Sequence, residues 1–107
     1  MEVPFRPLGK VMEIASSTGL DISYAFDDLI FSEHSIFIIR FDKIHEDLIH
    51  LYINCDCEEL TASKISQTLL NEAKNHKLKL IHSGKFRLKQ KIDSEEIDIE
   101  FFDNALN

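Results

Sequence analysis

The sequence predicts a two-layer α+β domain in which two helices lie against an antiparallel sheet of about five strands, in the order αβββαββ. Three observations predict this class. Apolar residues recur with helical spacing in two stretches, they alternate with polar residues at period two in several others, and the three glycines stand at boundaries between these stretches. The chain has 107 residues, so we expect a single domain over residues 1–107.

The first helix is expected to begin near Pro7, because proline is favoured at the first helical position. The apolar stripe of this helix is expected to contain Leu8, Val11, Met12 and Ala15. Gly19 follows where a left-handed C-terminal cap is favoured. Residues 22–31 are expected to be extended, with a change of phase at Asp27 and Asp28 that indicates a bulge or a tight turn.

Two strands and a second helix are predicted in the middle of the chain. Residues 36–41 are apolar at both parities, which is typical of a central strand, and residues 48–57 form the next strand. The helix is predicted over about residues 61–75, where Thr61 is a plausible N-cap and lysines lie near the C-terminal end. Its buried stripe is expected to contain Ala62, Ile65, Leu69 and Ala73.

An alternation of charged and apolar residues near the C-terminus predicts a β-hairpin. A strand that starts at Leu78 continues through a basic, alternating stretch to residue 92, residues 93–96 form the turn, and an acidic, alternating strand covers residues 97–101. The expected pairs are Ile92 with Ile97, Lys91 with Asp98, and Lys89 with Glu100. Pairs of opposite charge stabilise such a register by roughly a few tenths of a kcal/mol each.

The register expected between the two central strands leaves one sheet face without a helix. If Phe41 lies opposite Leu48, every second side chain of the two strands lies on the sheet face that the helices cover, and the side chains between them lie on the exposed face. Exposed apolar patches usually mark contact surfaces, so we expect a partner-binding or self-association face there. The residues expected on this face are Phe37, Ile39, His50 and Tyr52. The alternative is that the ends of the chain cover it, through Pro4, Phe5 or Phe102.

The charge of the chain is unevenly distributed. Its net charge is −7, and residues 1–60 carry 12 acidic and 4 basic residues. An acidic chain whose bases are largely paired is a poor candidate for binding a phosphate backbone, and no apolar run is long enough to span a membrane, so we expect neither nucleic acid nor membrane as a partner. The acidic half suits a basic protein. Its candidate acidic surface consists of Asp27, Asp28, Glu33, Asp42, Glu46 and Asp47.

Motifs for catalysis or cofactor binding are weak. The glycines are not clustered and the five histidines have no fixed spacing to a serine or cysteine nucleophile, so we expect no enzyme, no catalytic residue and no cofactor. Cys55 and Cys57 share a strand face, with His34 opposite Cys55 in the expected register. A structural zinc site needs a fourth ligand, so no metal site is predicted. Two cysteines at this spacing favour a reducing, cytoplasmic setting.

The order of one helix, three strands, a helix and two strands over residues 7–102 of a small acidic chain resembles the specialised chaperones of type III secretion. The resemblance implies a dimeric cytoplasmic protein that holds an extended partner segment against apolar patches. These chaperones usually carry a further C-terminal helix, which we do not expect within residues 103–107, and the resemblance assigns a role to none of the residues of this chain.

Three functions are compatible with the sequence. The first is a non-catalytic protein-binding module, chaperone-like or adaptor-like, that forms a homodimer through the exposed apolar face. The second is an acidic inhibitor or immunity protein against a basic toxin or a nucleic-acid-binding protein, which needs the acidic residues to converge on one surface. The third is a small enzyme or ligand-binding domain, which needs a concave pocket lined by polar groups. Binding led by charge weakens with ionic strength, whereas apolar binding does not.

Overall fold

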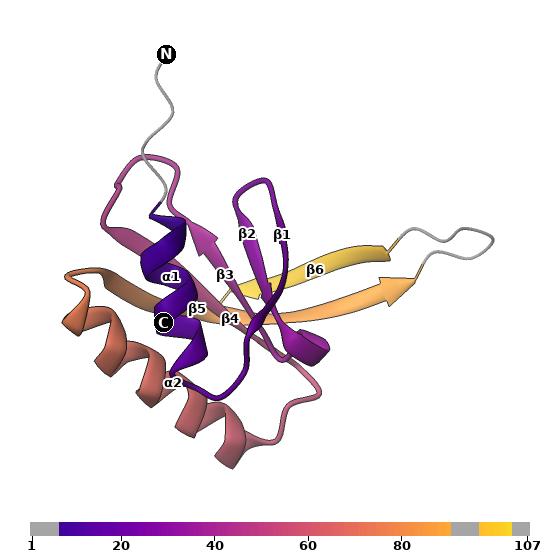
Figure 1. Cartoon of the computed structure of the whole chain (residues 1–107). Coiled ribbons are helices and arrows are strands. Elements are labelled where there is room, and N and C mark those ends of the chain that lie inside the picture. The colour runs from indigo at the N-terminus through magenta and orange to yellow at the C-terminus, as the bar shows by residue number, and fades with distance from the viewer. Residues whose placement is uncertain (1–6, 91–96, 104–107) are drawn as a thin grey trace.

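The computed structural model describes residues 7–90 and 97–103, and this part of the chain forms two α-helices and a six-stranded sheet (Figure 1). The elements are α1 (Leu8–Ser16), β1 (Ile22–Phe26), β2 (Leu29–Ser32), the short 3-10 helix η1 (Glu33–Ser35), β3 (Phe37–Phe41), β4 (Leu48–Asn54), α2 (Glu59–Asn75), β5 (Lys79–Gln90) and β6 (Ile97–Asp103). The strands lie in chain order across the sheet, and each neighbouring pair is antiparallel except β4 and β5, which are parallel.

The α+β class with two helices is confirmed, but the sheet is mixed and has six strands rather than being antiparallel with about five. The segment expected as one strand, residues 22–31, is a hairpin of β1 and β2. Asp27, with φ of 55°, and Asp28 form its two-residue turn, so the tight turn is confirmed at the change of phase. The parallel pair arises because α2 carries the chain back from the end of β4 to the start of β5, as in a βαβ unit.

Helix α1 packs on the sheet through a stripe that differs by part of a turn from the expected one. Val11, Ile14 and Ala15 are buried, whereas Leu8 and Met12 are 42% and 45% exposed. The i, i+3 and i+4 positions of the buried set still form one helical face.

Helix α2 confirms its expected stripe. Ile65, Leu69 and Ala73 are buried and Ala62 packs beside them, although the helix begins at Glu59 rather than Thr61. These side chains join those of α1 and one face of the sheet in a single core, so both helices cover the same face. Gly19, with φ of 86°, confirms the left-handed position after α1. Among the described residues, no helix is long and apolar enough to cross a membrane.

The expected register between β3 and β4 is wrong by one residue. Phe41 lies opposite Ile49 rather than Leu48. A shift of one residue moves every side chain of a strand to the other face, so Phe37 and Ile39 lie against the helices and are fully buried. Because these strands are apolar at both parities, hydrophobic alternation could not fix the register.

The hairpin of β5 and β6 is confirmed with its register shifted by two residues. Lys89 lies opposite Asp98 and Arg87 lies opposite Glu100, so each basic residue still faces an acidic one. Because side chains alternate between faces, a two-residue shift of the pairing leaves each side chain on the face where it was expected. The expected turn, residues 93–96, and the expected pairing partners at 91 and 92 lie outside the described residues.

Candidate binding surface

The sheet face that the helices leave uncovered is largely apolar. Its centre consists of Ile38, Tyr52 and Phe86, all of which are buried. Half-buried apolar side chains surround this centre: Leu29, Phe31, Leu88, Ile99 and Phe101. Residues paired across neighbouring strands share a face, so this group lies opposite the helix-covered core.

The sheet curls, so that its first and last strands line one hollow of about 390 Å³ on this face. The hollow is lined by Ser23, Tyr24, Phe26, Phe31, Ser35, Leu88, Ile97 and Ile99. We call the hollow and the apolar residues around it the concave face. Three large side chains at its rim are mostly exposed: Tyr24 at 57%, Phe26 at 61% and Ile97 at 58%. Exposed apolar groups that meet around one hollow are typical of contact surfaces.

The aromatic rings of the β1–β2 hairpin form an ordered group at this rim. The ring centroids of Tyr24 and Phe26 lie 6.3 Å apart with nearly parallel planes, and those of Tyr24 and Phe31 lie 5.7 Å apart at 49°. Side chains at every second position of a strand point the same way, which places the rings of β1 together. Because packed rings have few rotamers to lose, they offer contact area at low entropic cost.

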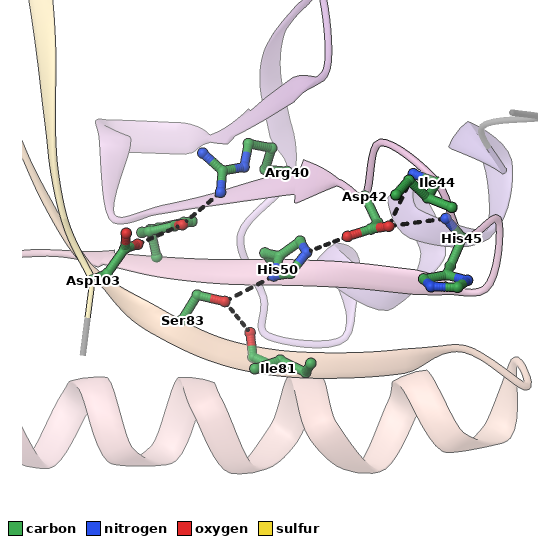
Figure 2. A network of polar contacts seen from close by, with 9 residues as sticks. Arg40, Asp42, Ile44, His45, His50, Ile81, Ser83 and Asp103 are labelled. Atoms are coloured by element: carbon green, nitrogen blue, oxygen red, sulfur yellow. Dashed lines mark hydrogen bonds and ion pairs between the residues drawn. The ribbon is translucent and has the colours of Figure 1, made fainter. Parts of the chain in front are cut away.

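A polar network closes the other end of the concave face (Figure 2). Arg40 donates a hydrogen bond of 2.8 Å to the Tyr52 hydroxyl, which donates one of 2.9 Å to Asp103. The Arg40 guanidinium lies 5.0 Å from the ring centre of Tyr52 and 5.4 Å from that of Phe101. Burial raises the pKa of Tyr52, and the hydrogen bond to Asp103 raises it further. Tyr52 is thus held between β3 and β6, and β6 covers it.

A second set of polar contacts joins Asp42, His50 and Ser83 (Figure 2). His50 Nε2 lies 2.9 Å from Asp42 Oδ1, and His50 Nδ1 lies 2.9 Å from Ser83 Oγ. The hydrogen bond from His50 holds the pKa of Asp42 well below its usual range, and the backbone N–H groups of His45 and Ile44 act in the same direction.

This arrangement has the donor and acceptor order of a serine activated by histidine. If Nε2–H donates to the carboxylate, Nδ1 of His50 is left as an acceptor for the Ser83 hydroxyl, whose oxygen also lies 3.4 Å from a second acceptor, the Ile81 carbonyl oxygen. Ser83 occupies the register shift of β5, where Leu51 pairs with His82 but Tyr52 pairs with Gly84. A bulge of this kind redirects a side chain, here toward His50.

A polar pocket of about 290 Å³ lies between α2 and the C-terminal end of β4. Its hydrogen-bonding side chains include Asn54, Ser63, Gln67, His82 and Lys85. Cys57 also lines it, and burial, followed by the charge of Glu58, raises the pKa of this thiol. The pocket provides the kind of lining that a small polar ligand would need.

The candidate acidic residues lie at two ends of the sheet. The β1–β2 turn lies beside the end of β3, because Phe41 N donates a hydrogen bond of 2.9 Å to the carbonyl of Asp28. The end with this turn and the β3–β4 loop holds Asp27, Asp28, Asp42, Glu46 and Asp47. Glu33 lies at the opposite end of β2, where it accepts a hydrogen bond of 2.8 Å from the N–H of Asp21. Five of the six acidic residues are therefore brought to one end.

The cysteines carry free thiols, with Cys55 exposed and Cys57 half-buried. β4 ends at Asn54, so the expected strand does not continue through them, and with the observed register His34 is not paired with Cys55. His34 instead lies in η1 with φ of 59°. Within residues 7–90 and 97–103 there is no group of three or more His, Cys, Asp or Glu side chains that could hold a metal ion.

The residues expected at the partner-binding face are split between the two faces of the sheet. Phe37 and Ile39 belong to the helix-covered core, whereas Tyr52 belongs to the concave face and His50, two positions before it on β4, lies on the same side of the sheet. Of the residues expected as an alternative cover, Pro4 and Phe5 lie outside the described residues, and the ring of Phe102 contacts Arg87. Sequence reasoning missed the rim residues, although Tyr24 and Phe26 share one parity of a strand without charges. No family model, curated protein or solved structure matches this chain.

Proposed function

We propose that this protein is a non-catalytic protein-binding module, chaperone-like or adaptor-like, that holds an apolar segment of a basic partner protein against its concave face. The observation that carries the proposal is the hollow of about 390 Å³, whose rim exposes Tyr24, Phe26 and Ile97. Covering the exposed part of one such side chain contributes roughly 1–2 kcal/mol to binding before ordering costs.

The basic character of the partner is supported by the charges beside the hollow. Residues 21–39, which include β1 and β2, have four acidic residues and neither lysine nor arginine. Asp27 and Asp28 follow Phe26 directly and form the turn after β1, so two acidic residues stand at the end of the strand that carries the exposed ring. Complementary charge at a rim speeds association and selects partners, whereas the apolar centre of an interface supplies most of the affinity.

The proposal is tested by capture from the native host with three immobilised proteins: the wild type, Phe26→Glu and Ile44→Glu. Ile44 is 75% exposed in the β3–β4 loop, so its variant adds the same charge outside the hollow. We expect a basic protein to be retained by the wild type and by Ile44→Glu, lost with Phe26→Glu, and bound again when it is purified. Its binding should weaken, but persist, at high ionic strength. Identical retention by all three proteins would contradict the proposal.

A second candidate function, ester hydrolysis through Ser83, is favoured by the contacts of Asp42, His50 and Ser83. The Ser83 oxygen would attack a substrate carbonyl carbon and give its proton to His50 Nδ1, which would pass it to the leaving alcohol; water would then release the acyl group. We place this function second because neither the hollow nor the polar pocket has Ser83 in its lining.

Hydrolysis is tested with a fluorophosphonate probe and p-nitrophenyl acetate, using the wild type, Ser83→Ala and His50→Gln. Under the binding proposal we expect no labelling of Ser83 and equal acetate hydrolysis by the three proteins. Labelling of Ser83 that disappears in His50→Gln would instead establish the second function, because only an activated hydroxyl reacts with this probe.

A further inference from the structure

We infer that the partner segment docks on β1 as an added strand, an inference that rests on the proposed function and specifies how the same surface is used. β1 and β6 are the two edges of the sheet. An edge exposes a row of backbone N–H and C=O groups that invites pairing with another chain, and natural sheets usually block it with charged side chains or proline. The two edges of this sheet differ in that respect.

Within residues 7–90 and 97–103, no strand pairs with the outer side of β1, and the β6 edge carries charged residues whereas the β1 edge carries none. β6 contains Asp98, Glu100 and Asp103, whereas β1 contains no charged residue and no proline. Every residue of β1 after Ile22 is exposed. The bulge near the start of β1 leaves the pairs from Tyr24 onward in regular register, so the open part of the edge is a regular strand.

The backbone groups that an added strand would use are those of Ala25. Because only two residues separate Phe26 from Leu29, these two form the hydrogen-bonded pair that closes the hairpin. In an antiparallel pair the next residues, Ala25 and Ile30, do not exchange hydrogen bonds. The N–H and C=O of Ala25 therefore point away from β2, toward the free edge.

An added strand would also present side chains to the hollow. Successive side chains of a strand alternate between faces, so every second residue of the partner would lie beside Tyr24 and Phe26 on the concave face. Main-chain hydrogen bonds to Ala25 would fix the segment, and the hollow would select its apolar residues.

The charges at the ends of β1 identify the occupant as a basic segment of another protein. Asp21 precedes the strand, and Asp27 and Asp28 follow it, so carboxylates stand at both ends of the open edge. A segment with lysine or arginine at each end of a short apolar run complements them. A second copy would pair its own β1 antiparallel to this one and bring acidic ends together at both sides, which is unfavourable.

The inference is tested with a synthetic nonapeptide of alternating valine and threonine between paired lysines. Two control peptides are used, one with glutamates in place of the lysines and one with N-methyl groups at its central residues. We expect the lysine-ended peptide to bind at least about tenfold more tightly than either control, because one lacks the complementary charge and the other lacks backbone donors. Equal binding by the N-methylated peptide, or no binding by the lysine-ended one, would overturn strand addition.

Variants of the protein separate this inference from the proposed function. Ala25→Pro removes the backbone donor at the edge without removing a hydrogen bond to β2. We expect its affinity for the lysine-ended peptide to fall about tenfold, as for Phe26→Glu. Ile44→Glu should bind this peptide as the wild type does. Binding lost with Phe26→Glu but kept with Ala25→Pro would overturn strand addition and leave the proposed function intact. Binding that is equal in all variants would contradict both. Sedimentation that shows a wild-type dimer, which Phe26→Glu dissociates, would assign the edge to a second copy and overturn the inference.

Discussion

Asp42 shows at the scale of one residue how a loop is fixed to the sheet. Its two carboxylate oxygens accept hydrogen bonds from His50 on β4 and from the backbone N–H groups of Ile44 and His45. All three contacts favour the ionised carboxylate and lower its pKa. An ionised Asp42 therefore holds the start of the β3–β4 loop against the strand that follows it.

The lowered pKa of Asp42 makes stability depend on pH in the acid range. The stabilising contribution of this carboxylate is fully present above the pKa of an unfolded aspartate, about 3.9, and is lost as the pH falls toward the lower pKa of the folded state. We therefore expect the free energy of unfolding of the wild type to fall more between pH 7 and pH 3 than that of Asp42→Asn. Urea unfolding at the two pH values measures this difference. Equal falls for the two proteins would show that Asp42 is not held in this way.

At the scale of an element, β5 depends on a glycine where it passes β6. A Cβ atom at Gly84 would overlap the carbonyl oxygen of Phe102 and lie 2.9 Å from the Cα of Asp103. The close approach follows the bulge at Ser83, which lets β5 pair with both β4 and β6 along its length. β6 in turn covers Tyr52, so this glycine sets one wall of the concave face.

We expect Gly84→Ala to lower the free energy of unfolding by about 1–3 kcal/mol, because backbone on a neighbouring strand must move to admit the methyl group. Gly9→Ala is the matched control, since a Cβ atom there meets nothing within 4 Å and alanine favours the helix. The control should be unchanged or more stable by up to about 1 kcal/mol. Thermal or urea unfolding measures both, and a Gly84→Ala variant as stable as the wild type would refute the close contact.

The elements of this fold differ in how far the sequence could predict them. Both helices, the turn at Asp27 and Asp28, and the β5–β6 hairpin follow from local spacing and turn chemistry. The register of β3 with β4 does not, because residues such as Ile38 and Ile39 are both apolar and fit either face. The parallel pairing of β4 with β5 depends on how α2 packs across the sheet before β5 begins, and local sequence patterns do not show this packing.

The sequence predicts that the candidate site is an apolar sheet face, but not which residues form it. A sheet face without helices and with apolar residues follows from two helices placed on one side of a sheet. Its residues do not follow, because the wrong register exchanged Phe37 for Ile38 and the curl of the sheet brings β1 near β6. Asp42, His50 and Ser83 come from three segments and meet only through strand pairing and a bulge, so their spacing in the chain carries no signal.

At the scale of the whole molecule, one curled sheet serves two purposes. Its convex side packs with α1 and α2 into the core that stabilises the fold. On its concave side, polar contacts hold Tyr52 at one end, and the exposed rings of the β1–β2 hairpin line the hollow at the other. Apolar surface on the concave side therefore lies beside the uncharged edge of β1. This proximity is the basis for expecting an extended partner segment there.

Amide hydrogen exchange of Ala25, followed by NMR with and without the lysine-ended peptide, tests the central claim most directly. The account predicts fast exchange in the free protein, because this N–H points to the free edge, and strong protection when the peptide is bound. Protection confined to α2 or the polar pocket, with the Ala25 amide unchanged, would contradict it.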